Sequence, residues 1–155
     1  MPSIAHGDCR IAASRVARGT HEGELMTIVA MLLLAAAPCS ETTTRAAEEC
    51  LAAELAVVDA RLNRYYDAAV SRLARQEETG ALARLRASER AWVAYREREC
   101  DAVWEYWKPG TIRGVFDAEC RLRLTKDRTL TIWRNWLTYV DRTPPLLPEP
   151  PSSDR

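Results

Sequence analysis

The chain has 155 residues, enough for one domain with tails, and its 22 Lys and Arg residues balance its 22 Asp and Glu residues. Without net charge, it has no overall field that would favour nucleic acid or an anionic membrane as its partner. Both histidines, His6 and His21, precede residue 26, so the rest of the chain lacks the residue that Ser-His triads and most zinc sites use. A composition rich in Ala, Leu and Arg predicts an all-α fold.

The first predicted element is the apolar run L-M-T-I-V-A-M-L-L-L-A-A-A at residues 25–37. It is short for a membrane span and matches the apolar region of a secretory signal peptide, with Met26 as an alternative start. We expect residues 1–38 to be a leader and the protein to be periplasmic or secreted; a buried internal helix is the competing interpretation. Cys39 also fits a lipoprotein signal, but Pro38 directly before it is atypical, so we expect a disulfide there and no lipid anchor.

The first helix of the body is expected over residues 44–77. Apolar residues recur along it at every third or fourth position, the period of a helix with one buried face. They are Leu51, Leu55, Val58, Leu62, Tyr65, Ala69 and Leu73. Gly80 marks the turn that follows.

Two more helices are expected, over residues 81–107 and 115–140. The first of them ends at Pro109 and the glycine after it, because Pro cannot continue a helix and Gly readily adopts the left-handed cap. The last ends before two consecutive prolines, and residues 143–155 are expected to form a Pro-rich disordered tail. The sequence therefore predicts an antiparallel three-helix bundle over residues 39–142.

The interface between the first two helices is expected to contain a polar pair. Arg96 lies on the apolar side of its helix, and a turn near Gly80 places Asn63 of the preceding helix level with it. We expect a buried hydrogen-bonded pair between Asn63 and Arg96, because large aromatic residues such as Trp92 cluster at that level. The alternative is that both side chains project into solvent.

Four cysteines follow the leader, and in an exported protein an even set predicts disulfides. Cys100 and Cys120 lie at similar distances on either side of the turn between the last two helices, so helical geometry favours their pairing. Cys39 and Cys50 would then form the second bond. A Cys50–Cys100 bond is the rival, because both residues lie towards one end of the first hairpin. The long spacings and missing histidine disfavour a metal site, and we expect no cofactor.

An acidic run in the second helix has two interpretations. Glu97, Glu99, Asp101 and Glu105 contain carboxylate pairs of the kind that a glycosidase needs, but charges interleaved with Arg are more typical of a solvated face. We therefore take Glu97, Asp101 and Glu105 as a candidate partner-binding face and expect no catalytic residue.

A series of motifs runs through the body from about residue 39 to residue 132. Its members are Cys50, Leu62, Asn63, Tyr66, Trp92, Tyr95, Arg96, Cys100, Gly110, Thr111, Cys120, Thr125 and Arg128. In this order they resemble the lysozyme inhibitor LprI N-terminal domain family, a group of small secreted or lipid-anchored bacterial proteins. Glu97 departs from the family's usual Asp, and Pro109-Gly110 replaces its doubled Gly.

The resemblance implies a helical, disulfide-tied envelope protein without catalytic activity, whose partner is lysozyme. The alternative is a structural or stress-related envelope module that binds another envelope protein and has no lysozyme activity.

Overall fold

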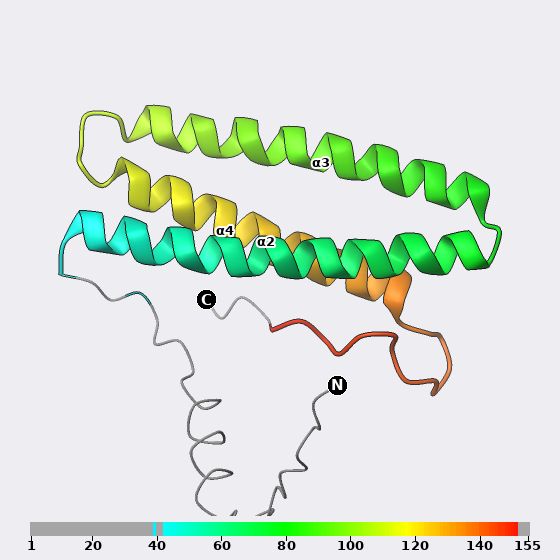
Figure 1. Ribbon diagram of the computed structural model, residues 1–155. Helices are drawn as coiled ribbons and strands as arrows, with labels where there is room; N and C mark the ends of the chain where they lie inside the picture. The colour runs from blue at the N-terminus through cyan, green and yellow to red at the C-terminus, as the bar shows by residue number, and fades with distance from the viewer. Residues whose placement is uncertain (1–38, 40–41, 152–155) are drawn as a thin grey trace, which may run out of the picture. The chain divides into compact units, whose positions relative to one another are not determined.

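The computed structural model describes residue 39 and residues 42–151, and these contain three long helices and no strand (Figure 1). Helix α2 spans Thr44–Arg75, α3 spans Thr79–Tyr106 and α4 spans Arg113–Ile132. A short π-helix, η1 (Trp133–Leu137), continues α4. The predicted all-α, three-helix fold is confirmed. The signal-like run at residues 25–37 lies outside the described residues, among which no helix is long and apolar enough to cross a membrane.

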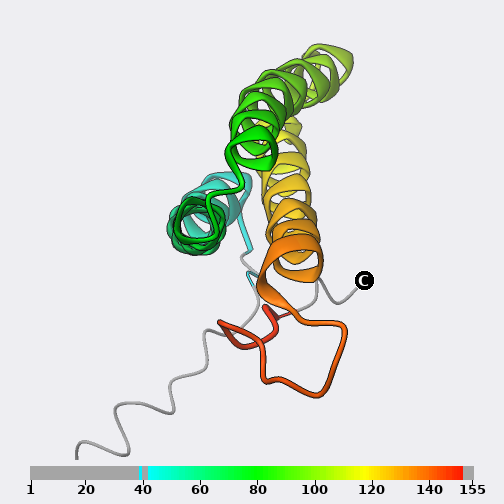
Figure 2. The same cartoon turned by 90° about the vertical axis from the view of Figure 1, so that its right-hand side faces the viewer.

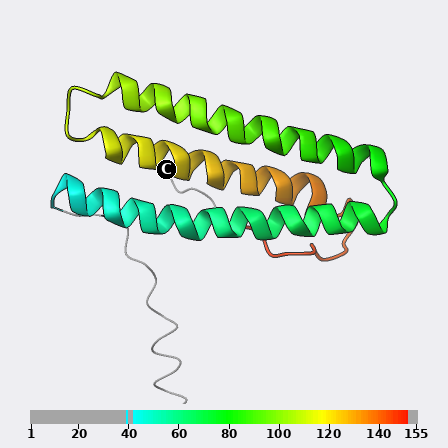
Figure 3. The ribbon, with the colours of Figure 1, turned by 45° about the horizontal axis from the view of Figure 1, so that its top comes forward.

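Helix α4 is the central element of the bundle. It packs against α2 and against α3, whereas α2 and α3 contact each other less (Figure 3). Figure 2 shows α2 and α3 close together near their connecting turn and diverging towards the other end, so that α4 alone joins them there. At this end, α3 is therefore held to α2 mainly through the contacts that both helices make with α4.

The core follows the apolar seam predicted for α2. Six of its seven residues are buried, and Leu55 is half-buried. The largest cluster lies where α2, the start of α3 and the end of α4 meet. It contains Leu62, Tyr65, Ala69, Leu73, Leu85, Ile132 and Leu137. Burial of such side chains typically contributes about 1.5–3 kcal/mol each, so this end is the hydrophobic anchor of the fold.

Both disulfides have the expected connectivity: the bond that helical geometry favoured and the one that the two remaining cysteines then form. Cys100 of α3 bonds Cys120 of α4 with their Cα atoms 5.7 Å apart, and Cys39 bonds Cys50 of α2 with a Cα separation of 5.8 Å. The rival Cys50–Cys100 bond is excluded. The first disulfide ties α3 to α4 at the end where α3 has left α2, and the second ties the segment before α2 to that helix.

The helix expected to reach residue 140 ends three residues earlier, at Leu137. Arg72 of α2 donates hydrogen bonds from Nη1 to the backbone oxygens of Trp136 and Thr138, at 2.8 and 2.9 Å. Its guanidinium also lies 4.3 Å from the centre of the Tyr139 ring. A cation that satisfies the last free carbonyls stabilises the end of the helix at this point.

Residues 143–151 correct the expectation of a disordered tail. They form neither helix nor strand, as their prolines predict, but they lie along the bundle (Figure 1). The hydroxyl of Tyr65 donates to the backbone oxygen of Pro148 at 2.7 Å, and Nε1 of Trp133 donates to that of Leu147 at 2.9 Å. The side chain of Leu147 packs against the core. Two aromatic donors and an apolar contact hold the segment in place.

Candidate functional site

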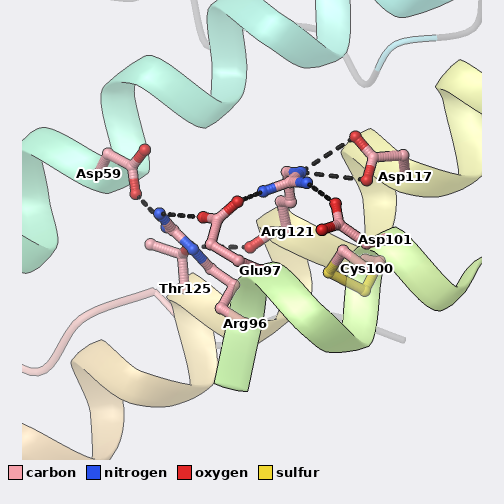
Figure 4. A network of polar contacts seen from close by, with 9 residues as sticks. Asp59, Arg96, Glu97, Cys100, Asp101, Asp117, Arg121 and Thr125 are labelled. Atoms are coloured by element: carbon pink, nitrogen blue, oxygen red, sulfur yellow. Dashed lines mark hydrogen bonds and ion pairs between the residues drawn. A yellow bond between two sulfur atoms is a disulfide. The ribbon is translucent and has the colours of Figure 1, made fainter. Parts of the chain in front are cut away.

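Charged side chains from all three helices meet beside the Cys100–Cys120 disulfide (Figure 4). From α3, Nη1 of Arg96 donates to Oδ1 of Asp59 on α2 at 2.7 Å and to Oγ1 of Thr125 on α4 at 2.9 Å. Thr125 is fully buried and Arg96 is largely buried. One cation therefore connects α3 to both other helices at the level where α2 and α3 begin to separate.

The partner of Arg96 corrects the pairing expected from the sequence. Asp59 lies one turn before Asn63 on α2, and Asn63 is exposed. The error comes from the turn: it is centred near Glu77, which adopts a left-handed φ of 57°, while Gly80 already belongs to α3. Moving the turn by this amount shifts the facing positions by about one helical turn. The shift also gives Arg96 a carboxylate, which binds a guanidinium more strongly than an amide does.

Arg121 of α4 is the second cation of the network. Its Nε donates to both carboxylate oxygens of Asp117 at 3.0 and 3.1 Å, Nη2 donates to Asp101 at 3.1 Å, and Nη1 donates to Glu97. Burial alone would lower the pKa of Arg121, but its hydrogen bonds to Asp117 and Glu97 outweigh this and raise that pKa. The hydrogen bond from Arg121, together with the positive charge of nearby Arg96, lowers the pKa of Glu97.

The network carries an excess of negative charge. We define it as Asp59, Arg96, Glu97, Asp101, Asp117, Arg121 and Thr125. It contains four carboxylates and two guanidiniums, a net charge of two negative units. Asp101 is the most exposed of the acids that contact Arg121, with 70% of its side chain accessible. The inner part of the network therefore joins helices, and its outer part presents negative charge to solvent.

A separate ion pair joins α3 to α4 one to two turns away. Arg128 donates from Nε and Nη2 to Oε2 of Glu89 at 3.0 and 2.8 Å, and these side chains are only 14% and 16% exposed. The ring of Trp92 lies between this pair and the network along α3, with its centroid 5.9 Å from Cζ of Arg128 and 5.0 Å from Cζ of Arg96. Cations at such distances interact favourably with an indole face.

The structure brings together only part of the motif series. Trp92, Arg96, Thr125 and Arg128 are neighbours in the interface, and Leu62 is in the core. Tyr66 is half-buried against the core. Cys50, Cys100 and Cys120 are in the two disulfides, and the other four members, Asn63, Tyr95, Gly110 and Thr111, are exposed.

The candidate partner-binding face lies on α3, where Glu97, Asp101 and Glu105 recur at four-residue steps. Glu97 and Asp101 belong to the network, and Glu105 pairs with Lys108. All three carboxylates thus have a cationic neighbour. The face is not a set of free acids, and its negative character comes from the excess of carboxylates in the network.

Sequence reasoning missed three members of the network and one surface. Asp59, Asp117 and Arg121 were not recognised as ion-pair partners, although Asp117 and Arg121 have the four-residue spacing of a helical ion pair. The surface consists of exposed aromatic residues at the turn from α3 to α4. The sequence did indicate this surface, because three aromatic residues fall within 104–107. Neighbours this close on one helix cannot all face the core, so some of them must be exposed.

The network is better suited to attracting a charged partner than to transferring a proton. A general acid needs a raised carboxyl pKa, whereas the pKa of Glu97 is lowered by its contact with Arg121. Within residues 39 and 42–151, no group of three or more His, Cys, Asp or Glu residues could hold a metal ion. All four cysteines of this region are in disulfides.

Comparison with known proteins gives one finding. A family model described as "Lysozyme inhibitor LprI" matches residues 35–131. This span includes both disulfides, the complete network and the Glu89–Arg128 pair. No curated protein and no solved structure matches the chain.

Proposed function

The chain belongs to the lysozyme inhibitor LprI family, and from this membership we propose that it is an exported, non-catalytic protein that binds lysozyme or a similar muramidase. The observation that carries the proposal, beside the family, is the net charge of two negative units within the network, whose carboxylates come from all three helices. Lysozymes of this kind are usually cationic. A local excess of carboxylates is the charge complement of such a partner.

The distribution of charge answers a difficulty that the composition raises. A neutral chain gives a cationic partner no long-range attraction. Within the network, however, two cations are shared among four acids, and Asp101 lies at the exposed edge. Such a patch acts over about one Debye length, roughly 8–10 Å in physiological salt, so it would orient a partner that is already close.

Two further features support export to the envelope. Disulfides persist mainly in oxidising compartments, and the described part of the chain has two of them. The apolar run at residues 25–37 has the length of the apolar region of a signal peptide. We therefore place the protein in the periplasm or outside the cell.

The test is a cell-wall clearing assay with a c-type lysozyme and an equimolar amount of the protein, purified with its disulfides formed. We expect inhibition. Asp101→Asn should weaken it by about two- to fivefold, the effect of one exposed charge pair, and more at low salt. Asp67→Asn, which removes an exposed acid of α2 outside the network, is the matched control and should not change it. Undiminished lysozyme activity at a large excess of the protein would refute the proposal.

The alternative function is that of an interaction module for another envelope protein. The exposed aromatic residues at the α3–α4 turn favour a protein partner of some kind. Capture of one envelope protein by cross-linking in the native cell, together with no inhibition of lysozyme, would select this alternative.

A further inference from the structure

The turn from α3 to α4 carries an exposed aromatic surface that the network does not explain. We call it the aromatic tip and define it as Trp104, Tyr106, Trp107, Ile112 and Arg113. The four apolar members are all exposed, Tyr106 to 77%. Exposed apolar side chains are ordinary when they are scattered, but a contiguous group at one end of a molecule is typical of an interaction site.

The tip is held in one conformation. The rings of Trp107 and Phe116 stack with centroids 4.4 Å apart, and Tyr106 meets Trp107 edge-on at 5.3 Å. Nη1 of Arg113 donates to the backbone oxygen of Lys108 across the turn at 3.2 Å. A surface that is already ordered loses little conformational entropy when it binds, so these contacts favour affinity.

The tip also presents a cation. Cζ of Arg113 lies 4.8 Å from the centre of the Trp104 ring, and no carboxylate in the described part of the chain lies within ion-pair distance of its guanidinium. Lys108, by contrast, is paired with Glu105. Arg113 therefore has N–H groups available for a partner, and its planar guanidinium can bind a carboxylate through two parallel hydrogen bonds.

We propose that the aromatic tip enters the substrate cleft of the muramidase, an inference that rests on the proposed function. A protruding tip fits a concave site, and Trp and Tyr are the residues that most often dominate the energy of a protein interface. Glycoside hydrolases of this class act with a pair of carboxyl groups. The guanidinium of Arg113 is complementary to such a pair.

The candidate partner-binding face lies next to the tip and would contact the same partner. Glu97, Asp101 and Glu105 follow α3 up to the tip, so their surface would meet the rim of the cleft while the tip lies inside it. In this arrangement the tip supplies most of the affinity, and the acids supply orientation and rate of association. A lipid surface is the other environment that Trp, Tyr and Arg suit, but the carboxylates beside the tip disfavour it.

Two pairs of variants test the proposal by calorimetric titration against c-type lysozyme. Tyr106→Ala should raise Kd about 30-fold or more, the effect of a hot-spot residue. Its control is Tyr95→Ala, the same change at an exposed position three turns earlier on α3, which should leave Kd within about twofold. Arg113→Ala should also weaken binding by tenfold or more, whereas Arg123→Ala, at an exposed position of α4, should not.

Competition locates the contact. Tri-N-acetylchitotriose, a sugar that occupies the lysozyme cleft, should raise the apparent Kd in proportion to its concentration. If the unaltered protein binds lysozyme but the sugar does not compete, or Tyr106→Ala binds as tightly as the unaltered protein, the tip proposal is wrong and the proposed function stands. If the unaltered protein does not bind lysozyme, both are wrong.

Discussion

The Glu89–Arg128 pair offers the sharpest test of how the helices are held together. Arg128→Met keeps most of the side-chain volume and removes the cation, which leaves the carboxylate of Glu89 without its ion-pair partner and with only 16% of its side chain exposed. Removing one partner of a fully buried pair costs about 3–5 kcal/mol, and exposed pairs are worth about 0.2–1 kcal/mol. At this exposure we expect the free energy of unfolding to fall by about 2–3 kcal/mol.

The double variant Glu89→Leu with Arg128→Met separates the pair from the rest of the packing. Replacing a buried ion pair by apolar residues is often close to neutral, so the double variant should lie within about 1 kcal/mol of the unaltered protein. The single variant Glu89→Leu completes the cycle, and the coupling free energy should then be at least about 1 kcal/mol. The exposed pair Arg45–Glu49 on α2 is the control, and its cycle should show no resolvable coupling.

Urea unfolding followed by far-ultraviolet circular dichroism gives each free energy by linear extrapolation. A coupling free energy between Glu89 and Arg128 below about 0.5 kcal/mol, the range of independent sites, would contradict this prediction. That result would mean that water screens the pair as it screens a surface pair.

Three other predictions use the same unfolding measurement. Replacing Cys100 and Cys120 together by Ser should lower the free energy of unfolding by about 3 kcal/mol, because the bond closes a loop with a sequence separation of 20; an unchanged value would contradict this. The lowered pKa of Glu97 means that its stabilising effect is complete above the unfolded pKa and is lost as the pH falls through the folded one. Glu97→Gln should therefore be less stable at pH 7, and its difference from the unaltered protein should shrink below about pH 4.5; a constant difference would be inconsistent with this. Tyr65→Phe should cost about 1 kcal/mol through the lost hydrogen bond to Pro148, and no loss would show that the tail does not need this contact.

The sequence predicted features that depend on periodicity and on equal spacing. The apolar seam of α2 was identified because helical periodicity places Leu51, Val58 and Leu62 on one face, and the structure buries all three. The disulfide between Cys100 and Cys120 was favoured because these residues lie symmetrically about a turn. Both inferences tolerate an error of a residue or two in the helix ends.

Features that depend on the exact centre of a turn were not predictable. Gly80 suggested the turn between α2 and α3, but Glu77 takes the left-handed conformation, and Arg96 therefore meets Asp59 and not Asn63. Left-handed φ values are uncommon outside Gly, so sequence alone favours the wrong residue. The pairing of facing side chains changes with a shift of only a few residues.

The tail and the aromatic tip show a second limit. Prolines predict the absence of helix over residues 143–151, but nothing local indicates that Tyr65 and Trp133 donate hydrogen bonds to that segment. Tyr65 is distant from the segment in the sequence, and Trp133 reaches it only because the chain changes direction between them. Likewise, the three aromatic residues within 104–107 cannot all face the core of one bundle, but only the packed structure shows that Trp104, Tyr106 and Trp107 are all exposed.

We propose that an anionic network and an adjoining aromatic tip bind a cationic muramidase. Isothermal titration of the protein, with its disulfides formed, into c-type lysozyme at low and at high salt tests it most directly. We expect an equimolar complex whose affinity falls as the salt concentration rises, because the carboxylates around Arg121 contribute part of the attraction. No detectable binding at low salt, where that attraction is strongest, would contradict it.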